Sequence, residues 1–161
     1  MQTLATIGVY GFDLDGFLAA LEEADVSLLL DVRQRRGVRG REYSWANSLR
    51  LQGSLAERGV SYAHRPELAP TTELRRLQYR EDAAAGVGKR SRVELAQEYR
   101  VRYTSEILDR ADLGAVLALM PRGRASALMC VERDPQACHR SLIAERMAQE
   151  LGLAVVHLLP A

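Results

Sequence analysis

The sequence predicts an α/β domain in which a mostly parallel sheet of about five strands carries helices on both faces. Its 161 residues are 47% hydrophobic and 27% charged, which suits a globular protein with a buried core. Short apolar runs alternate with segments of helical periodicity along the chain, as in successive β-α units. No fixed-period repeat or low-complexity segment interrupts this alternation, so residues 1–161 are expected to form a single domain.

Five apolar runs are the expected strands: residues 4–9, 26–32, 60–63, 125–131 and 154–159. None approaches the roughly 20 apolar residues that a bilayer-spanning helix needs, and the N-terminus lacks the pattern of a signal peptide. We therefore expect a cytoplasmic protein without membrane contact.

Two helices are expected between the first three strands. Asp13 is placed to cap the first helix, with Phe12 and Phe17 packed across its start as a hydrophobic staple. Ser44 is placed to cap the second helix, which ends at Gly59 because glycine readily adopts the left-handed conformation.

The segment between the third and fourth strands is harder to assign. Prolines near the start of residues 66–90 and glycines near their end indicate a long irregular excursion over the carboxyl ends of the strands. Ser91 and Glu94 have the spacing of a capping box and predict a helix that begins there. Asp112 is expected to start a further short helix that ends at Pro121.

The basic residues are unevenly distributed, although the net charge is only +1. Lys89 is the single lysine beside 21 arginines. Five arginines stand within nine residues and are followed by Tyr43 and Trp45, whose planar rings can stack on bases. This arginine segment is either a solvated loop or a phosphate-binding surface. Its members are Arg33, Arg35, Arg36, Arg39 and Arg41.

Polar side chains gather where three of the predicted strands end. In open parallel sheets, ligands bind outside the carboxyl ends of the strands. A buried sheet has no packing use for many charges there, so the gathering indicates a site. The residues are Asp31 and Arg33 after the second strand, His64, Arg65 and Glu67 after the third, and Cys130, Glu132, Arg133, Asp134, Cys138, His139 and Arg140 after the fourth.

The segment after the fourth strand predicts a helix start. Asp134 suits the N-cap and Pro135 the first helical position, which places Cys138 and Arg140 in or just after the first turn. A helix N-terminus and nearby guanidiniums favour a reactive thiolate, and the same amides hold anions such as phosphate. Helical phase directs Arg140 toward the sheet and Cys138 toward solvent or a covering loop.

Each candidate also has a structural interpretation. Cys130 ends an apolar strand and fits there as a small hydrophobic residue. Cys138 and His64 are each either functional or structural. Asp31 is placed either for acid-base work or for orienting an arginine through an ion pair.

A metal site is a further alternative. Two cysteines are too few for a disulfide framework. Their spacing from histidine is unlike the common zinc patterns, and a cysteine and histidine adjacent in sequence rarely bind one ion. No glycine-rich phosphate loop or dinucleotide fingerprint follows a strand, so no cofactor is expected. The conceivable ligands of zinc or iron are Cys130, Cys138, His139 and His64.

Four motifs stand out along the chain: Thr6-Ile7-Gly8, Leu30-Asp31-Val32-Arg33, His64-Arg65-Pro66-Glu67-Leu68, and Leu128 to Pro135 with Cys138-His139-Arg140. They resemble the bacterial domain-of-unknown-function family 488, and the resemblance covers nearly the whole chain. It implies a compact α/β domain and no established activity. Most members have Gly-His-Ser where this chain has Gly8-Val9-Tyr10, so any role of that histidine is absent here. Asp31-Val32-Arg33 also occurs in rhodanese-like domains, but their cysteine loop is not recognisable.

The leading hypothesis is an enzyme-like site for a small anionic substrate, phosphate-bearing or nucleotide-like. The expected catalytic residues are Cys138 as nucleophile, His64 or His139 as base, and Asp31 or Glu132 as orienting group. The alternatives are a noncatalytic module that binds nucleic acid or a partner protein through the arginine segment, and the metal site. The expected substrate-binding residues are Arg33, Arg35, Arg36, Arg39, Arg140, His139, Glu67 and Glu132.

Overall fold

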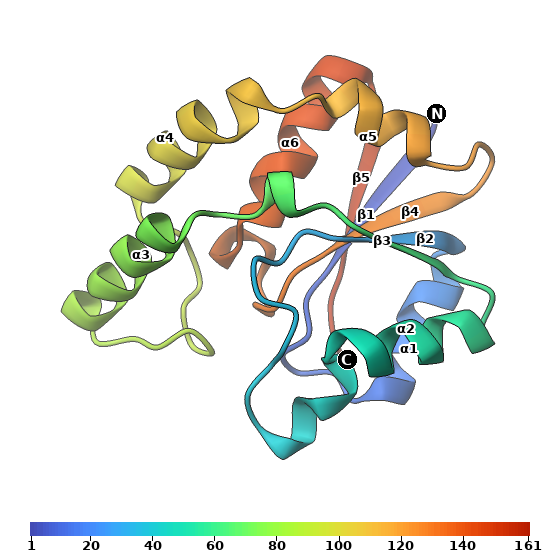
Figure 1. Ribbon diagram of the computed structural model, residues 1–161, viewed down its shortest axis with the longest axis horizontal. Helices are drawn as coiled ribbons and strands as arrows, with labels where there is room; N and C mark the ends of the chain where they lie inside the picture. Colours follow the sequence, from blue (N-terminus) through green and yellow to red (C-terminus); the bar gives the residue numbers. More distant parts are fainter.

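A computed structural model describes residues 1–161 and contains one sheet of five parallel strands (Figure 1). The strand order is β3-β2-β4-β1-β5, and every neighbouring pair is parallel. Each strand lies within two residues of a predicted apolar run, which confirms the fold class. The strands are β1 (Thr3–Ile7), β2 (Val26–Asp31), β3 (Ser61–His64), β4 (Ala125–Met129) and β5 (Ala154–Leu158).

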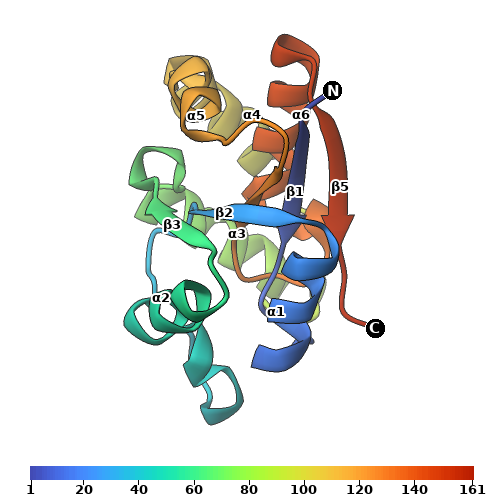
Figure 2. The same ribbon diagram turned by 90° about the vertical axis from the view of Figure 1, so that its right-hand side faces the viewer.

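Helices cover both faces of the sheet, as predicted (Figures 1 and 2). Helices α1 (Leu14–Glu23) and α2 (Ser48–Glu57) pack on one face. On the other face lie α4 (Gln97–Glu106), α5 (Leu113–Leu119) and α6 (His139–Leu151). Helix α3 (Thr72–Ala85) packs against α4 beyond the carboxyl ends of the strands. No helix is long and apolar enough to span a membrane.

Several of the predicted helix boundaries are confirmed. The Asp13 carboxylate accepts a hydrogen bond from the Gly16 amide at 2.8 Å. The Phe12 and Phe17 rings meet edge to face, with 5.8 Å between their centroids. Asp112 caps α5 in the same way, through the Ala115 amide.

The predicted starts of α2 and α4 are wrong, because other groups bond the two serine hydroxyls that were expected to cap these helices. A 3-10 turn over Arg41–Ala46 precedes α2, so this helix begins at Ser48 rather than after Ser44. The predicted capping box does not form, and α4 begins only at Gln97. Instead, the Ser91 hydroxyl accepts a hydrogen bond from the Gly88 amide at 2.9 Å and closes a turn.

Residues 66–90 are more regular than predicted, because most of them form α3. Thr71 caps this helix through the Leu74 amide, and Gly86 ends it in the left-handed conformation, with φ at 72°. The helix buries only a narrow apolar stripe that includes Leu74 and Leu77, and half of its remaining residues are charged. This weak amphipathic signal explains why the prolines and glycines on either side dominated the prediction.

Strand order opens a crevice above the middle of the sheet. From β2 the chain continues to α2 on one face, and from the adjacent β4 it continues to α6 on the other. Where neighbouring parallel strands send their connections to opposite faces, a binding crevice forms at the carboxyl ends.

Candidate active site

A cavity of about 690 Å³ lies at the carboxyl ends of β1, β2 and β4. Its walls come from the segments after these strands, from α3, from Tyr99 of α4 and from the loop 86–96 between those helices. Glu132 is the only acidic side chain in the lining, whereas seven cationic side chains line it. The excess of positive charge makes the cavity suitable for an anion. The cations are Arg33, Arg35, Arg39, Arg75, Lys89, Arg90 and Arg92.

Cys138 lies at this cavity and immediately before helix α6. A 3-10 turn over Pro135–Ala137 separates Asp134 from α6, so the helix begins at His139 and Cys138 is its N-cap. The predicted start at Pro135 is therefore wrong. Cys138 has extended backbone, with φ at −139°, and does not follow the helical phase that would have directed it outward. Its side chain is buried, with only 1% of the residue exposed.

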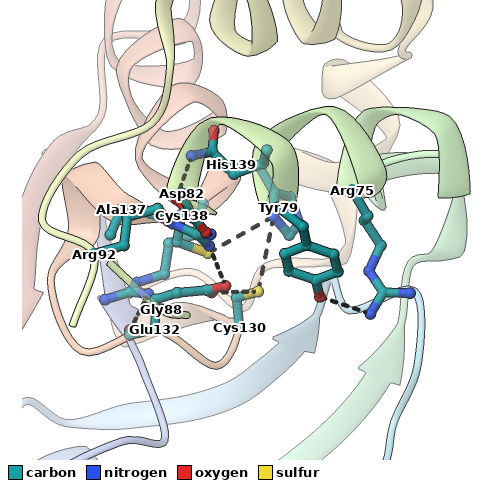
Figure 3. A network of polar contacts seen from close by, with 12 residues as sticks. Arg75, Tyr79, Asp82, Gly88, Arg92, Cys130, Glu132, Ala137, Cys138 and His139 are labelled. Atoms are coloured by element: carbon teal, nitrogen blue, oxygen red, sulfur yellow. Dashed lines mark hydrogen bonds and ion pairs between the residues drawn. The ribbon is translucent and has the colours of Figure 1, made fainter. Parts of the chain in front are cut away.

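The two cysteines and His139 converge on one point (Figure 3). Nδ1 of His139 is 3.7 Å from the Sγ atoms of both Cys130 and Cys138. On the other side of the ring, Nε2 donates a hydrogen bond to the Val32 carbonyl at 2.8 Å, which holds the imidazole in place. An Oε2 atom of Glu132 lies 3.5 Å from Cys130 Sγ.

This arrangement shifts the pKa values of Cys138 and Cys130 in opposite directions. Burial alone raises the pKa of Cys138, but the hydrogen bond from Cys130 and the charge of His139 outweigh it and lower that pKa well below its usual value. Burial and the neighbouring thiolate raise the pKa of Cys130. Burial also lowers the pKa of His139, but the thiolate reverses this effect and raises it. The site thus favours a Cys138 thiolate beside a His139 imidazolium.

The guanidinium of Arg140 is a further positive charge that acts on the Cys138 thiolate. Its side chain faces the sheet, as predicted from helical phase. It is fully buried and donates hydrogen bonds to the carbonyls of Glu132 at 2.6 Å and Arg133 at 3.1 Å. No carboxylate forms an ion pair with it, and its charge contributes to the low pKa of Cys138. Gly8 leaves room for this contact, since a Cβ atom there would lie 1.9 Å from the Glu132 carbonyl oxygen.

Arg92 connects loop 86–96 to the same site. Its guanidinium bonds Asp82 of α3 at 2.6 Å, Glu132 at 2.8 Å and the Ala137 carbonyl at 3.1 Å (Figure 3). The side chains of Arg92, Asp82 and Glu132 are all buried. Gln78 donates to the second oxygen of Asp82 at 2.8 Å. The network holds α3, loop 86–96 and the β4–α6 connection together around the cysteines.

Two residues predicted to be catalytic do not reach Cys138. Asp31 bonds both Nε and Nη2 of Arg33 at 2.9 Å and accepts a hydrogen bond from the Tyr62 hydroxyl. His64 bonds the Arg33 carbonyl through Nε2 at 3.1 Å. Neither side chain lines the cavity. His64 is kept away by topology, because β3 lies at the sheet edge and β2 separates it from β4. Asp31 lies on β2 next to β4, but its carboxylate is held by Arg33 and Tyr62.

The predicted anion-binding residues also divide into two groups. Arg35 and Arg39 line the cavity, and their side chains have no hydrogen-bond or ion-pair partner. Arg36 instead contacts the Tyr62 hydroxyl at 3.4 Å, and Glu67 pairs with Arg65 outside the cavity.

The aromatic residues after the arginine segment are not free stacking surfaces. Trp45 is 8% exposed and packs on Phe17, with 5.0 Å between ring centroids. Arg90 lies over both the Tyr43 and Tyr10 rings, 5.1 and 5.2 Å from their centroids. The expectation that Trp45 offers a face to a base is therefore wrong.

Several residues of the site were not predicted from the sequence. Asp82, Lys89, Arg90 and Arg92 are brought to the cysteines by α3 and loop 86–96. The useful signal was the predicted excursion over the strand ends, which correctly placed this part of the chain. Nothing in the local pattern distinguished these charges from solvated ones.

Cys130, Cys138 and His139 could together hold a metal ion, since their ligand atoms lie within 4.8 Å of one another. Ligand atoms bound to tetrahedral zinc are about 3.5–3.8 Å apart, given the usual zinc–sulfur and zinc–nitrogen distances. The extended backbone of Cys138 lets two adjacent residues face the same point, which overturns the sequence-based objection. His64 is not part of this cluster.

Comparisons with curated proteins and with solved structures gave no match. The family model of the domain of unknown function DUF488 matches residues 13–147. The matched range contains the Asp31–Arg33 motif and the segment from Cys130 to Arg140 that builds the site. Since the match covers most of the chain, the protein belongs to the DUF488 family.

Proposed function

We propose that the protein is an enzyme in which the Cys138 thiolate attacks an electrophilic atom of a small anionic substrate. The observation that carries this proposal is the position of Cys138. It caps a 13-residue helix beside His139 and lies at a cavity lined by seven cationic side chains. A helix N-terminus and an adjacent imidazolium are the usual means by which proteins activate a cysteine nucleophile.

The roles follow from the contacts. Cys138 Sγ forms the new bond, and the leaving group departs with the electron pair of the bond that breaks. His139 carries a proton at Nδ1, 3.7 Å from Cys138 Sγ, which it can give to the leaving group. Cys130 stays a thiol, because burial and the neighbouring thiolate raise its pKa, and its proximity lowers the pKa of Cys138. Arg140 stabilises the negative charge from behind.

Charge and size support a small anionic substrate. Arg35 and Arg39 offer guanidiniums that no protein carboxylate neutralises. A volume of about 690 Å³ lies within the roughly 300–1,000 Å³ of small-molecule sites. The rival nucleic-acid hypothesis has less support, because Trp45 is buried and Arg33 is paired internally. The two free thiols also fit the reducing conditions of our proposed cytoplasmic location.

The first experiment measures the rate of iodoacetamide alkylation at each cysteine against pH, using peptide mass spectrometry on the native protein. We expect Cys138 to react as a thiolate well below pH 8.5, the approximate pKa of an ordinary thiol, and Cys130 to react far more slowly. His139→Asn removes the imidazolium and should move the Cys138 profile to higher pH. An ordinary profile for Cys138, or no reaction at either cysteine, would refute the proposal.

A metal centre is the second candidate function, favoured by the convergence of Cys130, Cys138 and His139. Such a site would have three protein ligands and a fourth position open to substrate, as catalytic zinc sites do. Metal analysis of tag-free protein purified without chelators tests it. One equivalent of zinc or iron that is lost in Cys130→Ser would establish the metal centre, and metal-free protein would exclude it under those conditions.

A further inference from the structure

Lys89 is the only lysine in a chain with 21 arginines, and it lines the same cavity as the two cysteines. It belongs to loop 86–96, whose other cations are occupied. Arg90 pairs with Glu42 at 3.0 Å, and Arg92 pairs with Asp82 and Glu132. Lys89 has no hydrogen bond or ion pair with any protein group, although it is half-buried. A cation without a partner therefore faces the cavity.

The surroundings of Lys89 keep it charged. Burial lowers the pKa of its ammonium, but the Glu132 carboxylate, together with Tyr79 and Cys130, outweighs burial and raises that pKa. Glu132 itself does not depend on Lys89 for an ion pair, since Arg92 donates to it at 2.8 Å. The ammonium thus remains available to a second anion.

The position of Lys89 also limits where that anion can lie. Lys89, Cys130 and Cys138 line the same cavity, and the Lys89 ammonium lowers the pKa of the Cys130 thiol against the larger effect of burial. An anionic group that bonds Lys89 therefore lies in the cavity that the attacking sulfur lines. A lysine suits such a place because its ammonium is a compact point charge with rotatable donors, whereas arginine presents a wide planar fork.

We propose that Lys89 binds an anionic group of the substrate immediately beside the atom that Cys138 attacks. The substrates are then compounds with a carboxylate or phosphate adjacent to the electrophilic centre. This inference rests on the proposed nucleophilic function and adds the substrate class to it.

Two alkylating reagents of similar size and different charge test the inference. Iodoacetate carries a carboxylate next to its electrophilic carbon, and iodoacetamide is its neutral counterpart. The rates of both reagents are measured at Cys138 by peptide mass spectrometry, and the iodoacetate-to-iodoacetamide ratio is divided by the same ratio for glutathione. We expect this normalised ratio to exceed one in the wild type.

Substitutions of Lys89 should change the ratio in a charge-dependent order. Lys89→Ala should lower it about tenfold, the effect of losing one charged hydrogen bond. Lys89→Arg should retain most of the preference, and Lys89→Glu should bring the ratio below one. Arg122→Ala is the matched control, because Arg122 is exposed at the opposite end of the sheet and unpaired. It should leave the ratio unchanged.

The possible failures are distinguishable. If Lys89→Ala slows both reagents equally, the lysine acts only on Glu132 and the thiols, so the inference is wrong while the nucleophile stands. The inference is also wrong, and the nucleophile still stands, if the normalised iodoacetate-to-iodoacetamide ratio is the same in the wild type and in all Lys89 variants. If wild-type Cys138 reacts with neither reagent, the proposed function fails and the inference fails with it. Circular dichroism shows whether each variant is folded. If Lys89→Ala does not fold, the comparison uses Lys89→Arg, which retains the charge.

Discussion

Three consecutive residues, Cys138, His139 and Arg140, supply the thiolate, its neighbouring imidazole and a buried guanidinium. They act on the same point because the backbone changes from extended to helical between the first and the second. Arg140 is unusual among them, since a buried cation without a carboxylate partner is costly. Its two carbonyl acceptors offset part of that cost, and the thiolate provides a compensating charge.

Replacing Arg140 by Met should therefore affect both reactivity and stability. Losing the positive charge raises the pKa of Cys138, so alkylation at pH 7 slows and the pH profile moves upward. The buried carbonyl of Glu132 and the partly buried carbonyl of Arg133 lose their donor, which should lower the free energy of unfolding by about 2–4 kcal/mol. Alkylation kinetics and urea denaturation measure the two effects. Arg146→Gln on the same helix is the control, and an unshifted pH profile in Arg140→Met would contradict the role of the buried charge.

The direction of Arg140 was predictable from the sequence, but the orientation of Cys138 was not. Helical periodicity predicts side chains within the regular helix, and Arg140 lies inside it. Cys138 lies one residue before it, where the helical phase no longer applies. The position of Cys130 beside His139 was not predictable for a related reason. It does end an apolar strand and is buried, but its partner His139 comes from another element nine residues away.

At the scale of elements, loop 86–96 shows why a local signal can lose to tertiary contacts. The Ser91–Glu94 pattern favours a helix start that is worth about 1 kcal/mol. Arg92 instead takes part in a buried network with Asp82 and Glu132, and breaking such a network costs about 3–5 kcal/mol. The larger contribution determines the path of the loop, so α4 begins only after Ala96.

Arg92→Met should destabilise the protein strongly, because it leaves two buried carboxylates without their cation. We expect the free energy of unfolding at pH 7 to fall by about 3–5 kcal/mol, as measured by guanidinium denaturation. Adding Glu132→Gln should restore part of the loss by removing one of the two charges. Arg90→Met, in the same loop but exposed, should change stability much less. Comparable effects of Arg90→Met and Arg92→Met would show that the buried pairs are not what holds the loop.

At the scale of the whole molecule, the sequence predicts the strands and the edge at which the cavity lies, but not which strand ends are adjacent. Strand order depends on pairing between segments far apart in the chain, which no local pattern records. The order β3-β2-β4-β1-β5 places His64, which ends the edge strand β3, one strand away from β4 and the cysteines that follow it. Asp31 and His64 stabilise the loop after β2, whereas Cys138 and His139 face the cavity.

The single lysine also gives limited proteolysis one defined cleavage site in the folded protein. A protease specific for lysine can cleave the folded chain at one bond, after Lys89, in the loop that borders the cavity. The resulting fragments, 1–89 and 90–161, should remain bound to each other, because β4 lies between β2 and β1 and β5 pairs with β1. The rate of that single cut measures how often loop 86–96 opens, and size-exclusion chromatography shows whether the nicked halves stay together. Their separation would mean that the interleaved sheet does not hold without a continuous chain.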